Sequence, residues 1–143
     1  MSITLHRLLL LLALAIGSLG LTACGGDEDG SATMRPGEAC IACHADDGEA
    51  PTFSFAGTVF GADGVQGAEG VTVTVEDSAA TTVEVTSNRA GNFFSETSLT
   101  PPFTVTLTSS GGATATMAID ATHGDCNLCH REGGDAGGPL VAP

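Results

Sequence analysis

Hydrophobic and polar residues alternate with a period of two along the middle of the chain. The alternation runs from Phe53 to Ile119, and turn sequences such as those at 61–64 and 109–112 interrupt it. A period of two places successive side chains on opposite faces, which is typical of β-strands. We therefore expect about six short strands. Their apolar positions lie within 53–59, 71–75, 83–85, 93–94, 103–107 and 113–119.

Short strands separated by regular turns predict an all-β fold, here a small antiparallel β-sandwich of about six or seven strands. We assign this domain to residues 53–121 and expect two loop segments, 34–52 and 122–143, to flank it. If the six strands simply alternate up and down, both flanking segments leave the sandwich at the same pole. A seventh strand or a long crossover is expected to separate them.

The N-terminus has the pattern of an export signal. An apolar run at 8–16 is too short to span a bilayer, and it is followed by Leu-Thr-Ala-Cys at 21–24. This sequence resembles the lipobox of bacterial lipoprotein precursors. We predict a signal peptide at 1–23, lipidation of Cys24 and a flexible acidic tether at 24–33. The alternative is an ordinary secretory signal with a chance cysteine.

The charge balance limits the partners. The chain has 17 Asp and Glu against 4 Lys and Arg, for a formal net charge of −13. Nucleic acid is excluded as a partner, because binding it requires a cationic surface. An acidic surface suits docking to a basic partner through long-range steering, or simply keeps the chain soluble.

Two Cys-x-x-Cys-His stretches stand on the two sides of the predicted sandwich. They are Cys40, Cys43 and His44 in the first motif, and Cys126, Cys129 and His130 in the second. This spacing is the attachment signature of a c-type haem: two thiols bond the porphyrin, and the adjacent imidazole becomes an axial ligand of the iron. We predict two covalently bound haems c. Zinc ligation, disulfides and redox-active dithiols are the alternatives.

Few residues remain as a second axial ligand. We predict His123, which stands three positions before Cys126; the alternative is that His123 is a solvent-exposed loop histidine and no ligand. If the two haems are adjacent, His123 is also placed to reach the first one. Met34 in the loop before the first motif is the other candidate, whereas Met117 fits the inward alternation of the last strand and is expected in the core.

Part of the chain also resembles a known domain family. Phe55-Ala56-Gly57-Thr58-Val59, the Gly-Val-Thr-Val-Thr-Val run at 70–75 and the turn ending in Gly91-Asn92-Phe93 are similar to the carboxypeptidase regulatory-like (transthyretin-like) β-sandwich. With its flanking motifs, the chain resembles bacterial dihaem c-type cytochrome lipoproteins. The resemblance implies a sandwich that has no active site of its own.

The expected function is electron transfer by a dihaem cytochrome that exchanges electrons with redox protein partners, and not enzyme catalysis. The lipid at Cys24 is the expected membrane contact and predicts a bacterial outer membrane lipoprotein that faces the periplasm or the cell surface. The alternatives are an interaction or scaffold module in a larger redox assembly, and an open haem that binds small ligands or cleaves peroxide.

Overall fold

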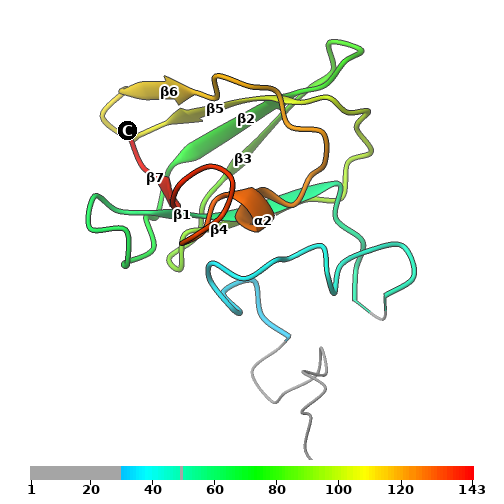
Figure 1. Cartoon of the computed structure of the whole chain (residues 1–143), viewed down its shortest axis with the longest axis horizontal. Helices are drawn as coiled ribbons and strands as arrows, with labels where there is room; N and C mark the ends of the chain where they lie inside the picture. Colours follow the sequence, from blue (N-terminus) through cyan, green and yellow to red (C-terminus); the bar gives the residue numbers. More distant parts are fainter. Residues whose placement is uncertain (1–29, 49) are drawn as a thin grey trace, which may run out of the picture.

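The computed structural model describes residues 30–48 and 50–143, so the predictions for residues 1–23 and for Cys24 lie outside the described residues. The fold is all-β, as the alternation predicted, with six strands on the six predicted runs and one more near the C-terminus (Figure 1). The elements are β1 (Phe55–Phe60), β2 (Thr72–Glu76), β3 (Thr82–Thr86), β4 (Asn92–Ser95), β5 (Thr104–Thr108), β6 (Thr114–Thr116), α2 (Cys126–Cys129) and β7 (Leu140–Val141).

Two sheets form the sandwich. One has three strands in the order β4-β1-β7, and the other has four in the order β3-β2-β5-β6. All pairings are antiparallel except that of β1 with β7. The inward positions of the alternating strands make the core, because only those side chains are removed from water on both sides. The core consists of Phe55, Val59, Val71, Val73, Val75, Phe93, Phe103, Val105, Leu107 and Leu140.

Strand β1 is the strand to which both cysteine motifs are attached. The first motif leads directly into it, and the Phe53 amide donates to the His44 carbonyl at 3.0 Å. The second motif reaches it from the edge opposite β4: Asp125 forms a parallel bridge with Ala56, and β7 pairs with Val59 and Phe60. Residues 126–139, which include α2, therefore form a loop whose two ends are both attached to the same edge of β1.

The two motifs lie side by side, but not because six strands alternate up and down. The strands do not alternate up and down in sequence, because β1 and β4 belong to one sheet and β2, β3, β5 and β6 to the other. A seventh strand is present, yet it does not separate the motifs. Instead the bridge of Asp125 with Ala56 places the second motif beside the start of β1, where the first motif enters, and β7 pairs with the other end of the same strand (Figure 1).

The last predicted strand is shorter and more exposed than expected. The alternation at 113–119 predicted four inward side chains, but β6 keeps three residues, all exposed, and Ile119 is 81% exposed. Met117 alone of the four packs against the core, as predicted. β6 is the edge strand of the four-stranded sheet, and the three-stranded sheet is too narrow to cover this edge.

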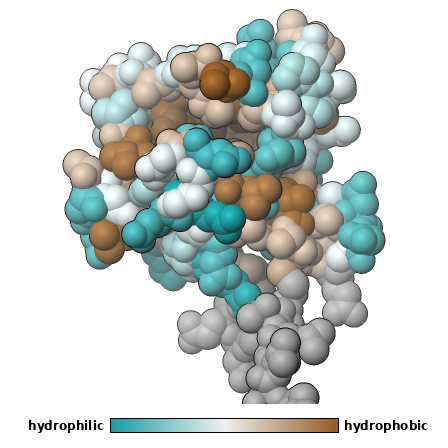
Figure 2. All heavy atoms as spheres, viewed as in Figure 1, coloured by the Kyte–Doolittle hydropathy of each residue, from teal (hydrophilic) through white to brown (hydrophobic). Residues whose placement is uncertain are grey.

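The surface mixes hydrophobic and hydrophilic side chains on the face drawn in Figure 2. The large hydrophobic residues that are exposed are Val65, Ile119, Leu128 and Val141. Within the described residues, no helix has the length and apolar character needed to cross a bilayer.

Candidate haem-binding site

Both cysteine motifs fold into the same local structure. In the first, the His44 amide donates to the Cys40 carbonyl at 3.1 Å; in the second, the His130 amide donates to the Cys126 carbonyl at 2.9 Å. These i→i−4 bonds close one helical turn in each motif, and in the second motif the turn is α2. Residues three apart on a helical turn lie on the same face, so the two cysteines of each motif project to the same side.

His44 is held in a defined orientation. Its ring is 8% exposed, and Nδ1 lies 2.7 Å from the Pro51 carbonyl oxygen, which can only accept a hydrogen bond. Nδ1 therefore donates to this carbonyl, which leaves Nε2 as the ring nitrogen that could bind a metal. The ring also stacks on Phe53 with centroids 4.0 Å apart, and Phe53 stacks on Phe94 at 4.6 Å. Metal-binding histidines commonly have such a second hydrogen bond to a backbone carbonyl.

His130 has a related setting at the end of α2. Burial lowers the pKa of its imidazole, and a hydrogen bond with the Gly138 backbone opposes this effect. Both motif histidines thus lie next to backbone groups that follow them by seven or eight residues, Pro51 and Gly138. Burial favours the neutral ring, which is the form that can bind a metal.

The two motifs are joined by the side chain of Asn127, which lies between the cysteines of the second motif. Asn127 is fully buried, and its Nδ2 donates to the Glu38 carbonyl at 2.8 Å and lies 3.8 Å from the Cys40 Sγ. Its Oδ1 accepts from the Thr58 amide at 2.9 Å. One amide side chain therefore contacts both motifs and β1.

Thr58 is the centre of this buried network. Its hydroxyl accepts from the Gly37 amide at 2.8 Å and from Asn127 Nδ2 at 3.1 Å, and donates to Asn92 Oδ1 at 2.8 Å. A hydroxyl offers one donor and two acceptor positions, so its capacity is filled. Asn92 in turn donates to the Met34 carbonyl at 2.7 Å. The network fixes the segment before the first motif on the sandwich.

Asp125 forms a second link between the motifs. It occupies the N-cap position of α2 but makes no side-chain cap there. Its Oδ2 instead accepts from the Ile41 amide at 3.2 Å, at the start of the first motif's turn. Its Oδ1 is buried and has no hydrogen-bond partner. Burial raises the pKa of this carboxyl, against hydrogen bonds led by that from Ile41, which lower it.

The cysteine side chains differ in state. Cys40, Cys126 and Cys129 carry free thiols and are half-buried, whereas Cys43 is disulfide-bonded. Cys43 would have to be reduced before it could form a thioether. Burial, and next the charge of Asp125, raise the pKa of Cys40 to about 11 and that of Cys126 to about 12. Both thiols are protonated at neutral pH, which disfavours the redox-active dithiol alternative, since redox cysteines have lowered pKa values.

Cys126 packs closely on the sheet. A Cβ atom at Gly57 in β1 would lie 2.8 Å from the Cys126 Cβ and 2.7 Å from the Phe93 Cζ. Only glycine allows α2 to approach β1 so closely. Gly124 is equally restricted, because a Cβ there would overlap the Ser54 carbonyl oxygen. These two glycines bring the second motif against the strand that the first motif enters.

Two hollows border the motifs. The larger hollow, about 640 Å³, is lined by Ile41, Ala45 and Asp46 of the first segment and by Phe53, Thr122 and His123 among others. The smaller hollow, about 470 Å³, is lined by His130, Gly37, Phe60 and residues of the loop that follows His130. Both have volumes typical of ligand pockets. No motif cysteine lines either hollow.

The fit to a covalent haem is therefore partial. The matched turns, the imidazoles that bond backbone groups and the hollows beside the motifs suit a histidine ligand next to a paired thioether anchor. Access to the thiols does not, because Cys126 lies against β1 and Cys40 against Asn127. A porphyrin bonded at the motifs would need access to these two sulfurs, which are half-buried and line neither hollow. In the described part of the chain, no three His, Cys, Asp or Glu side chains form a cluster that could hold a metal ion.

The candidate second ligands lie apart. His123 is exposed, with Nε2 3.9 Å from the Cys129 Sγ, and it lines the larger hollow beside residues of the first motif. Met34 is half-buried and lines neither hollow. The structure thus brings His123, although it precedes the second motif, to the hollow beside the first.

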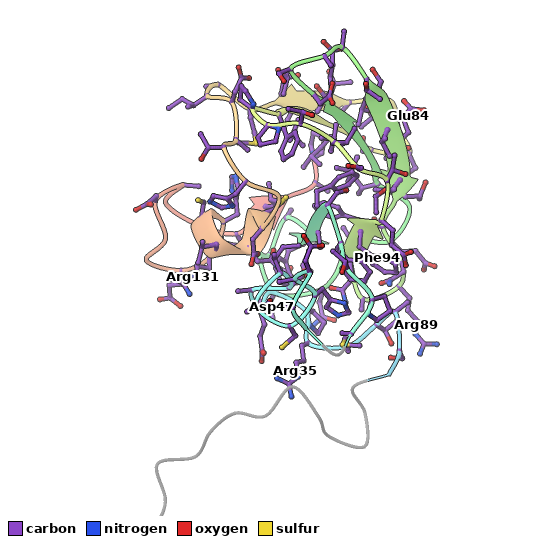
Figure 3. All side chains as sticks on the ribbon, turned by 90° about the vertical axis from the view of Figure 1, so that its right-hand side faces the viewer. Arg35, Asp47, Glu84, Arg89, Phe94 and Arg131 are labelled. Atoms are coloured by element: carbon purple, nitrogen blue, oxygen red, sulfur yellow. The ribbon has the colours of Figure 1, made fainter. Side chains whose placement is uncertain are left out.

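The arginines do not gather at one place. Figure 3 shows Arg131 beside α2, with Arg89 at the opposite side of the molecule and Arg35 below both. Arg35 lies 3.6 Å from Glu38. Peroxide cleavage at an open haem would call for an arginine beside a distal histidine, and neither hollow combines His123 with an arginine.

Sequence reasoning missed the residues that connect the motifs. The spacing of cysteines and histidines singles out neither Asn127 and Asp125 nor Thr58. The one signal in the sequence is the asparagine inside Cys-x-x-Cys, which is a costly residue to bury without partners. No protein-family model, curated protein or solved structure matches the chain.

Proposed function

We propose that this chain is a dihaem c-type cytochrome that transfers electrons between redox protein partners. The observation that carries the proposal is the equivalence of the two motifs: each folds into one helical turn closed by the histidine amide on the first cysteine's carbonyl. The same turn at both motifs is what attachment of the same group at both would require. The haem, when bound, supplies one-electron chemistry.

The chain's own residues would position the two groups. His44, with Nδ1 bound by Pro51 and its ring stacked on Phe53, presents Nε2 as an axial ligand. His130 would do the same at the second motif, and Cys40, Cys43, Cys126 and Cys129 would form the thioethers. His123 is the favoured second ligand, because it lines the hollow beside the first motif.

The location of the protein follows from the N-terminal pattern. We propose an exported lipoprotein, anchored through lipid at Cys24, in the bacterial outer membrane. The net charge of −13 supports partners with basic docking surfaces, because attraction between opposite charges accelerates encounter.

The test is a count of covalent haems in matched variants, produced together with a c-type haem-maturation system. The wild type should give a pyridine haemochrome of two haems per chain and sharp α and β bands on reduction. The pair Cys40→Ala/Cys43→Ala and the pair Cys126→Ala/Cys129→Ala should each leave one haem. The control Leu128→Ala, at an exposed position inside the second motif, should keep two.

The result also separates the alternatives. A chain without a Soret band and with stoichiometric zinc would overturn the proposal. A high-spin spectrum that shifts with carbon monoxide would instead point to an open haem that binds small ligands. His123→Ala should convert one haem of the wild type to this high-spin form, whereas Met34→Leu should not.

A further inference from the structure

Two side chains of the second segment bind the backbone of the first. The Ile41 amide donates to the Asp125 carboxylate, and the Asn127 side chain donates to the Glu38 carbonyl. Residues 84 and 89 positions apart are thereby joined at 3.2 and 2.8 Å. The second segment thus supplies both an acceptor and a donor to the backbone of the first.

We propose that Asn127, assisted by Asp125, is a positioning residue for the first haem site, so that the two motifs form one coupled unit. This inference rests on the proposed function. The Glu38 carbonyl and the Thr58 hydroxyl accept hydrogen bonds from this side chain of the second motif, and its contact with Thr58 is fully buried, where water cannot replace it. Loss of that side chain leaves buried acceptors unsatisfied, which favours opening of the first segment.

The coupling has a direct physical route. Asn127 lies in the turn between Cys126 and Cys129, so a haem bonded to these two cysteines would act directly on the turn that carries Asn127. Movement of this turn shifts Asn127 relative to Glu38 and Cys40. Binding of a haem at the second motif would therefore change the structure around the first motif through this direct contact. This effect adds to any electrostatic interaction between the two sites.

The inference is tested by hydrogen exchange and by redox titration of the full-length chain. Asn127→Ala should accelerate amide exchange in the segment 38–44 by roughly tenfold, because one buried tether is lost. Leu128→Ala is the matched control, since Leu128 is the neighbouring position of the same motif and is exposed. It should leave exchange in 38–44 unchanged.

The redox readout separates positioning from simple stability. In a chain that carries only the first haem, made with Cys126→Ser and Cys129→Ser, Asn127→Ala should shift the midpoint potential and the visible spectrum of that haem. Leu128→Ala should not. A role of Asn127 limited to its own turn cannot alter a haem attached to Cys40 and Cys43. If Asn127→Ala fails to fold, Asp125→Ala removes the other tether and should give the same pattern.

The outcomes are distinguishable. Exchange in 38–44 and a first-site potential that are the same in the folded Asn127→Ala and Leu128→Ala proteins would overturn the coupling and leave the cytochrome proposal intact. A wild type that binds no haem would refute the proposed function, and the coupling of haem sites with it, whatever the exchange data show.

Discussion

Substitution of Gly57 by alanine tests how closely the second motif is seated on β1. The added Cβ would lie 2.7 Å from the Phe93 Cζ and 2.8 Å from the Cys126 Cβ, both shorter than real Cβ contacts. Phe93 is 2% exposed and has no space to withdraw, so α2 must move away from the strand. Overpacking of this kind costs about 1–3 kcal/mol.

A second effect opposes this cost. Replacing glycine by alanine restricts the unfolded chain and stabilises the folded one by about 0.4–1 kcal/mol where the backbone allows it. The net loss for Gly57→Ala is then about 1–2 kcal/mol. For a domain of roughly 100 residues, this lowers the melting temperature by about 5–15 °C.

The assay is thermal and urea denaturation of the haem-free full-length chain, followed by circular dichroism. Gly111→Ala is the matched control, because a Cβ at this exposed turn would meet only the Ser109 Oγ, at 3.9 Å. It should change the free energy of unfolding by less than about 0.5 kcal/mol. If Gly57→Ala is as stable as Gly111→Ala, the close seating of α2 on β1 is wrong.

Three further predictions concern the sandwich and the proposed haems. Hydrogen bonds from the Thr100, Thr81 and Ala79 amides hold the pKa of Asp77 below its usual range, so its stabilisation is present above the pKa of the unfolded chain and is lost as pH falls through the folded value. Asp77→Asn should therefore be less stable than the wild type in urea titrations at pH 7 and lose less stability on acidification; parallel curves would contradict this. Val73→Ala should cost about 2–3 kcal/mol in the same assay, since Val73 is fully buried, and Thr74→Ala on the opposite face clearly less. The haem-free chain should melt well below the haem-loaded chain, and coincident melting curves would show that the haems add nothing to a small core.

The alternation of side chains located the strands because it depends only on neighbouring residues and a period of two. Val73 and Val75 in β2, and Val71 directly before it, are buried as predicted, since all three belong to one uninterrupted alternation. The same reasoning overextended the last strand: it gave Ile119 an inward position, but an edge strand of a wider sheet has nothing opposite its end. Alternation predicts which side chains share one face of a strand, but it does not predict whether another part of the protein covers that face.

The arrangement of the motifs was beyond such local reasoning. The side-by-side placement depends on a parallel bridge between Ala56 and Asp125 and on the return of β7 to β1, pairings that no periodicity encodes. The burial of Asn127 likewise depends on a hydroxyl at Thr58, 69 positions away. The motif residues were identifiable from the sequence because their chemistry requires a fixed local spacing, whereas their supports are distant in the chain.

The attachment of both motifs to one strand has a consequence for how the molecule is built. An open edge of β1 would expose unpaired amides and carbonyls to other chains. Here the segment that carries the second motif fills that edge, with the Ala56 amide donating to the Gly124 carbonyl and the Ala142 amide to the Phe60 carbonyl. The same backbone pairing therefore closes the edge of the sheet and positions the second motif. A change that frees the second motif from β1 also opens the edge, so defects in this segment should cause self-association as well as loss of the site.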